Sequence, residues 1–134
     1  MSPGNSALAA EDRERLAQGL SRVLADSYTL YLKTHNYHWN VEGPRFKGLH
    51  QLFEEQYTDL AAAIDEIAER IRALGHYAPG SFGEFARLTA VKEETGQPEA
   101  MEMVRRLAED QETLVATCRQ ALQTAQQTDD PATD

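Results

Sequence analysis

At 134 residues, with 41% hydrophobic and 26% charged residues, the chain has the size and composition of a single soluble domain, residues 1–134. No run of apolar residues approaches the ~18 that a membrane-spanning helix needs. The first ten residues lack the basic region and the long apolar run of a signal peptide. We therefore expect a cytoplasmic protein without a membrane partner. The net charge of −9 argues against direct DNA binding, which relies on Lys and Arg side chains. The negative charge either only keeps the protein soluble or also attracts cations to its surface.

The first predicted element is a helix over residues 7–39, because apolar and aromatic side chains recur there at steps of three and four. These side chains are Leu16, Leu20, Val23, Leu24, Leu30, Tyr31 and Tyr37. We expect the helix to end in the turn at residues 40–44, where Gly43 frees the backbone and Pro44 cannot continue a helix.

The second predicted element, residues 45–74, has the clearest pattern in the chain. Apolar side chains alternate steps of four and three at Phe53, Tyr57, Leu60, Ile64, Ile67, Ile71 and Leu74. This pattern is typical of a long amphipathic helix in a bundle. Gly75 suits the position that follows such a helix, where a left-handed backbone favours glycine.

A connection rich in Gly and Pro follows at residues 75–98, and residues 84–89 within it are expected to form a short helix. The third long helix is predicted over residues 98–126, with Pro98 in its first turn. Its expected core face consists of Met101, Val104, Leu107, Leu114, Val115, Cys118 and Leu122. Cys118 is interpreted as a small core residue, and a lone cysteine fits a reducing compartment. The prediction is therefore an all-α, up-down bundle of three long helices and a short one.

Two histidines and three carboxylates have a spacing that helices could bring together. They are His38 on the first predicted helix, and His50, Glu54, Asp65 and Glu69 on the second. This set of nitrogen and oxygen donors suits Fe(II), Mn(II) or Zn(II). At about 100° per residue, the four donors on the second helix fall at about 0°, 40°, 60° and 100°, and so form one polar stripe.

One chain cannot gather all five donors around a single metal ion. His50 and Asp65 are 15 positions apart, which corresponds to about 22 Å along a helix. In an antiparallel hairpin, His38, His50 and Glu54 would form one half-site, whereas Asp65 and Glu69 would form another half-site far along the bundle. A two-fold axis near the middle of the second helix would join the half-sites of two chains. The spacing therefore predicts two symmetric metal sites at a dimer interface.

Several of these residues lie in segments that resemble the Dps family, the miniferritins also described as DNA-binding proteins from starved cells. The segments are THNYHWNVEGP at 34–44, Leu49-His50 with Glu54, DEIAER at 65–70, Leu74-Gly75, Gly80-Ser81-Phe82, Glu84-Phe85 and Lys92-Glu93. The likeness extends over about residues 10–127. It implies a ferritin-like four-helix bundle that assembles into a hollow dodecamer.

The resemblance also implies an activity, namely oxidation of Fe(II) to Fe(III) with hydrogen peroxide and storage of the ferric product. Zn(II) or Mn(II) could substitute for iron. The residues implied to hold or oxidise the metal are His38, Trp39, His50, Glu54, Asp65 and Glu69, with Trp39 taking up an oxidising equivalent. His35 is either an extra ligand, a hydrogen-bonding neighbour or an exposed residue. Redox chemistry and aromatic packing explain Tyr28, Tyr31 and Tyr37 equally well.

The chain departs from the family pattern in two ways. It has no tail rich in Lys and Arg, so direct DNA binding is not carried over, and DNA would be protected only by removal of Fe(II) and peroxide. The family pattern continues into a fourth core helix, whereas this sequence stops at Asp134. We therefore expect a C-terminally incomplete domain in which Val104, Leu107 and Leu114 face an open groove. The dodecamer is expected only if a fourth helix is present.

Two functions besides that of a ferroxidase stay open on the sequence. A non-catalytic module could bind a divalent metal ion at the same residues without turning over peroxide. A structural helical bundle without a metal would be indifferent to replacement of Asp65 and Glu69 by Ala.

Overall fold

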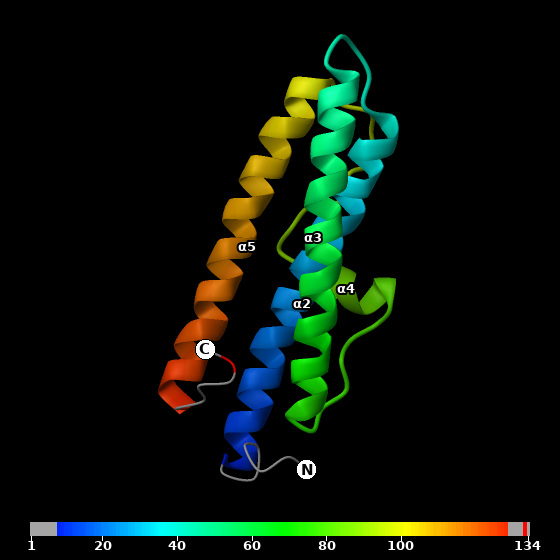
Figure 1. Ribbon diagram of the computed structural model, residues 1–134. Helices are drawn as coiled ribbons and strands as arrows, with labels where there is room; N and C mark the ends of the chain where they lie inside the picture. The colour runs from blue at the N-terminus through cyan, green and yellow to red at the C-terminus, as the bar shows by residue number, and fades with distance from the viewer. Residues whose placement is uncertain (1–7, 129–132, 134) are drawn as a thin grey trace.

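The computed structural model describes residues 8–128 and 133, which form three long helices and one short helix (Figure 1). The helices are α2 (Ala10–Asn40), α3 (Phe46–Ala73), α4 (Phe82–Leu88) and α5 (Ala100–Thr128). α2 and α3 form an antiparallel hairpin, α5 begins at the hairpin end and also runs antiparallel to α2, and α4 lies beside α2. The predicted all-α bundle is confirmed, with its short helix between the second and third long ones. None of the described helices is long and apolar enough to cross a membrane.

The helix ends follow the local sequence. Gly43 and Gly75 have φ values of 103° and 88°, in the left-handed region that favours glycine, and they occupy the turns after α2 and α3. α4 begins two residues earlier than predicted because Ser81 is its N-cap residue and bonds to Glu84 in the first turn. The Glu84 N–H donates to Ser81 Oγ at 3.3 Å, and the Ser81 hydroxyl donates to Glu84 Oε1 at 2.9 Å.

Two hydrophobic clusters occupy opposite ends of the bundle. The cluster at the hairpin end joins α2, α3 and α5 through Leu30, Tyr37, Val41, Phe53, Met103 and Leu107. The cluster at the far end joins all four helices through residues that include Leu16, Leu24, Ile71, Leu74, Phe85 and Ala125. The core therefore runs along α2, which packs against every other helix.

Buried polar groups on α2 hold α5 and the connection that precedes it. Asp26 is fully buried and accepts hydrogen bonds from the Thr89 hydroxyl and the Ala90 N–H, both at 2.7 Å, and from the Thr117 hydroxyl. Further along α2, Lys33 Nζ lies 2.8 Å from Asp110 Oδ2 and donates to the Lys92 carbonyl at 2.8 Å. These bonds define how α5 and the connection are placed against α2.

The predicted core face of α5 is partly wrong. Cys118 and Val115 are exposed and Met101 is 57% exposed, whereas Leu107 is buried rather than facing a groove. Val104 and Leu114 are half-buried, in partial agreement with the expected groove. The buried face instead includes small and polar residues, namely Asp110, Thr117, Ala121 and Ala125. Small side chains let α5 pack closely against α2: a Cβ atom added to Gly19 of α2 would lie 3.6 Å from the Cα atom of Ala121.

Within residues 8–128 and 133, α5 is the last helix. Residues 129–132 and 134 lie outside the described residues, and the expectation of an incomplete domain stays a prediction.

Candidate metal centre

His38 at the end of α2 and His50 in the second turn of α3 hold each other in place. Their rings stack with centroids 3.7 Å apart. Nδ1 of His38 lies 2.6 Å from the His50 carbonyl oxygen, and Nδ1 of His50 lies 2.7 Å from the His38 carbonyl oxygen. Because a carbonyl oxygen only accepts, each Nδ1 carries a proton. Nε2 is therefore the nitrogen of each ring that remains for a metal ion.

Glu54 completes this group at the hairpin end. It lies one turn after His50, and its Oε1 is 3.9 Å from Nε2 of His38. His38 is buried, whereas 57% of the Glu54 side chain is exposed. Phe46 packs against the His50 ring with centroids 5.0 Å apart. His38, His50 and Glu54 therefore lie near one another at the hairpin end, although these three described side chains are not close enough to hold a metal ion by themselves.

Asp65 and Glu69 lie on the other half of α3, where both are exposed. The rise of an α-helix places Asp65 about 22 Å from His50 along the axis. Within residues 8–128 and 133, no three His, Cys, Asp or Glu side chains are gathered closely enough to hold a metal ion. One chain thus presents two separate groups of donors rather than one complete site.

Trp39 and His35 extend the group as a set of aromatic contacts. Trp39 is 58% exposed, and its ring centroid is 3.9 Å from that of His35. His35 also stacks on Tyr57, with centroids 4.3 Å apart. Partial burial, followed by the nearby His38, lowers the pKa of His35. His35 therefore favours its neutral form and lies between two aromatic side chains.

Sequence reasoning missed Tyr57 as a neighbour of the histidines. Its ring meets His38 in a T-shaped contact with centroids 5.2 Å apart. The available signal was its spacing, since a residue three positions after Glu54 lies on the same side of the helix. The alternating steps of three and four along this helix instead led to the interpretation of Tyr57 as a core residue. Tyr57 is half-buried.

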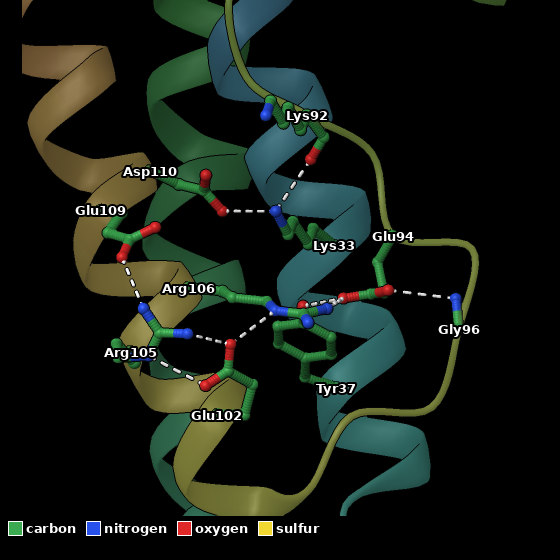
Figure 2. Close-up of polar contacts among 10 residues, drawn as sticks. All are labelled: Lys33, Tyr37, Lys92, Glu94, Gly96, Glu102, Arg105, Arg106, Glu109 and Asp110. Carbon is green, nitrogen blue, oxygen red and sulfur yellow. Dashed lines mark hydrogen bonds and ion pairs between the residues drawn. The ribbon is translucent and has the colours of Figure 1, made fainter.

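Tyr37, by contrast, belongs to a buried polar cluster on the α5 side (Figure 2). Its ring is fully buried, and its hydroxyl donates to Glu94. Burial and this hydrogen bond raise the pKa of Tyr37 well above its ordinary value. Aromatic packing and hydrogen bonding therefore account for Tyr37, one of the tyrosines for which the sequence left two interpretations.

Known proteins share this arrangement of helices. The Ferritin family model, described as a ferritin-like domain, matches residues 17–134. The structure superposes with a TM-score of 0.90 on a Dps protein from Vibrio cholerae O1, which is described as a member of a broad superfamily of ferritin-like diiron-carboxylate proteins. The two sequences are 35% identical, and the match covers 94% of this chain and 79% of that chain. The fold is therefore that of a ferritin-like domain.

Curated relatives narrow the family. DNA protection during starvation protein 2 of Bacillus anthracis is 36% identical over 120 residues, which are 90% of this chain and 82% of the relative. A low temperature-induced protein of Nostoc sp. is 47% identical over 116 residues, and the match spans 86% of this chain but only 65% of that relative. The chain belongs to the Dps family, as its sequence motifs predicted.

Proposed function

We propose that the protein binds Fe(II) between two copies of the chain, oxidises it with hydrogen peroxide and sequesters the ferric product, which limits oxidative damage to the cell. The observation that carries this proposal is the reciprocal pair of hydrogen bonds between His38 and His50. These bonds orient the two imidazoles and make Nε2 the nitrogen of each ring that is available to a metal ion, with the Glu54 carboxylate 3.9 Å from Nε2 of His38. Family membership supports the same chemistry.

Two chains are needed because the remaining carboxylates lie too far away. A two-fold axis near the middle of α3 would bring Asp65 and Glu69 of one chain to His38 and Glu54 of another. Exposed apolar side chains on α2 and α4 support a contact with another chain. Leu32, Trp39 and Phe82, which are 45%, 58% and 76% exposed, line a depression between α2 and α4. A second copy would cover this apolar surface.

The donor set suits the oxidation of iron. Carboxylates stabilise Fe(III) more strongly than Fe(II) because it carries the higher charge, and neutral imidazoles complete the coordination without adding charge. Two Fe(II) ions supply the two electrons that break the O–O bond of peroxide: 2 Fe(II) + H₂O₂ + 2 H⁺ → 2 Fe(III) + 2 H₂O. The net charge of −9 favours accumulation of cations near the protein. We expect Zn(II) and Mn(II) to compete for the same donors, and we assign to Trp39 the uptake of an oxidising equivalent.

Stopped-flow oxidation of Fe(II) by hydrogen peroxide tests the proposal, with Asp65→Ala and His38→Ala as the two disabling variants. Asp59→Ala is a matched control, since Asp59 is an exposed carboxylate on α3 that faces about 180° away from His50. We expect fast, saturable oxidation by the wild-type chain and by the control, and its loss in either disabling variant.

Mixing the two disabling variants tests the shared site directly. A mixed dimer of His38→Ala and Asp65→Ala chains contains one site with both changes and one intact site. Random pairing should therefore restore about a quarter of the sites. No recovery in a mixture that has exchanged subunits would contradict the two-chain site. Metal binding without oxidation in the wild-type chain would instead indicate the non-catalytic module.

A further inference from the structure

Phe46, the first residue of α3, is an aromatic neighbour of the histidine pair that the proposed function does not use. It precedes His50 by one helical turn, so both side chains lie on the same side of α3. The two rings stack with centroids 5.0 Å apart and an interplanar angle of 27°. The turn before α3 fixes the backbone here, because the Phe46 N–H donates to the Gly43 carbonyl oxygen at 3.1 Å. Phe46 therefore has a defined position beside His50, although it is 43% exposed.

The two histidines differ in how firmly other side chains hold their rings. His38 is buried, and its ring contacts Tyr57 in addition to His50. His50 is only half-buried and stacks on His38 and Phe46. Rotation of the His50 ring about its Cβ–Cγ bond would break both stacking contacts and separate Nδ1 from the His38 carbonyl oxygen, which lies 2.7 Å away. Phe46 therefore restrains His50 from outside the histidine pair.

We propose that Phe46 is a positioning residue of the candidate metal centre, and that its ring holds the His50 imidazole in the orientation that leaves Nε2 available to Fe(II). The inference rests on the proposed function, which makes His50 a ligand of iron. A side chain that is already ordered loses little conformational freedom when it binds a ligand, whereas a mobile side chain must be ordered at that moment. Phe46 therefore raises the affinity for Fe(II) without touching the metal ion.

This role predicts a difference between the binding of Fe(II) and its oxidation. Loss of a group that orients a ligating histidine typically lowers metal affinity roughly 10–100-fold, and a stacking contact belongs at the lower end of that range. Once iron is bound, the metal ion itself fixes the His50 ring. Without the Phe46 ring, the Fe(II) concentration at half-maximal rate should therefore rise about tenfold, while the maximal rate at saturating Fe(II) changes much less.

Three variants of the whole chain separate ring stacking from apolar bulk and from general destabilisation. Phe46→Leu keeps an apolar side chain without a ring, and Phe46→Tyr keeps the ring. Leu52→Ala is the matched control, because Leu52 is an apolar residue of α3 that is 41% exposed and lies about 160° around the helix from His50. Anaerobic calorimetric titration with Fe(II) alone measures affinity, and stopped-flow oxidation by peroxide measures the rates. Sedimentation velocity gives the oligomeric state of each variant.

A second readout needs no iron. In the metal-free chain with isotope-labelled histidine, the ring current of Phe46 shields the ring protons of His50 in nuclear magnetic resonance spectra. His76, in the turn that follows α3, is the internal reference at the far end of that helix. Phe46→Leu should move the His50 ring signals downfield and leave those of His76 in place. Phe46→Tyr should keep the His50 signals near their wild-type positions.

We expect Phe46→Leu to bind Fe(II) about tenfold more weakly than the wild-type chain, and Phe46→Tyr and Leu52→Ala to bind it nearly as well. Unchanged affinity in Phe46→Leu, or an equal loss in Phe46→Tyr, would overturn the inference. Unchanged His50 signals, or weaker binding that accompanies dissociation of the assembly, would overturn it as well. All these results leave the proposed function intact as long as the wild-type chain oxidises iron. Absence of Fe(II) binding by the wild-type chain would refute the proposed function and the inference together.

Discussion

Replacement of Glu94 by Gln tests whether the connection before α5 is held by a charged cluster. Glu94 Oε1 accepts from the Tyr37 hydroxyl and, at 2.6 Å, from Arg106, whereas Oε2 accepts from the Gly96 N–H at 3.0 Å (Figure 2). The Tyr37 hydrogen bond first, and then those from Gly96 and Arg106, lower the pKa of Glu94 from 4.5 to about 2, although partial burial opposes them. The ionised carboxylate therefore stabilises the folded chain.

The size and the pH range of this effect follow from the lowered pKa. A shift from 4.5 to about 2 corresponds to at most about 3 kcal/mol, and solvent screening around the partly exposed Arg106 reduces the expected value to about 1–2 kcal/mol. Because the folded pKa lies below the unfolded one, this stability is present above about pH 4.5 and is lost as the pH falls towards 2. Gln cannot titrate, so the variant lacks this contribution at every pH.

Urea unfolding followed by circular dichroism at a series of pH values measures the difference, at concentrations where both proteins have the same oligomeric state. We expect the wild-type chain to exceed Glu94→Gln by about 1–2 kcal/mol at neutral pH, and the gap to close as the pH falls below about 4.5. The exposed neighbour Glu93 serves as a control through Glu93→Gln. A gap that is absent at neutral pH, or that stays constant down to acid pH, would refute the reasoning.

Two further changes test the buried polar contacts of α2. Asp26→Ala removes the fully buried acceptor of three hydrogen bonds, one of them from the buried Thr117 hydroxyl, and should lower the free energy of unfolding by about 3–5 kcal/mol in urea titrations. A loss below about 1 kcal/mol would contradict the assigned bonds. Lys33→Met leaves Asp110 buried without its cation and should cost about 3–5 kcal/mol, whereas the double change with Asp110→Leu should recover most of that loss. A double variant no more stable than Lys33→Met would show that the buried charge is not the cause.

The helices and the division of the donors into two groups could be predicted because both depend on residues close together in sequence. The steps of three and four from Phe53 to Leu74 define one side of a helix, and Gly43 and Gly75 mark where the backbone turns. The same periodicity separates His50 from Asp65 along the axis. Whether the two groups of donors meet in an assembled protein stays a prediction.

The burial of α5 could not be predicted in the same way. A periodic pattern shows that a helix has an apolar side, but not how that side is rotated against its neighbour. Met101 and Cys118 were expected in the core and are exposed, while Asp110 and Thr117 are buried. Their burial depends on Lys33 and Asp26 of α2, which lie far away in sequence.

The amino-acid sequence thus determined the class of fold, the helix boundaries to within a few residues and the family, because local spacing and short motifs carry that information. Only the tertiary structure decided that His38 and His50 bond to each other's carbonyl oxygen, that Tyr57 contacts His38, and that Asp26 accepts from residues 63 to 91 positions away. These contacts depend on the packing of whole helices, which sets distances and rotations that no local pattern encodes.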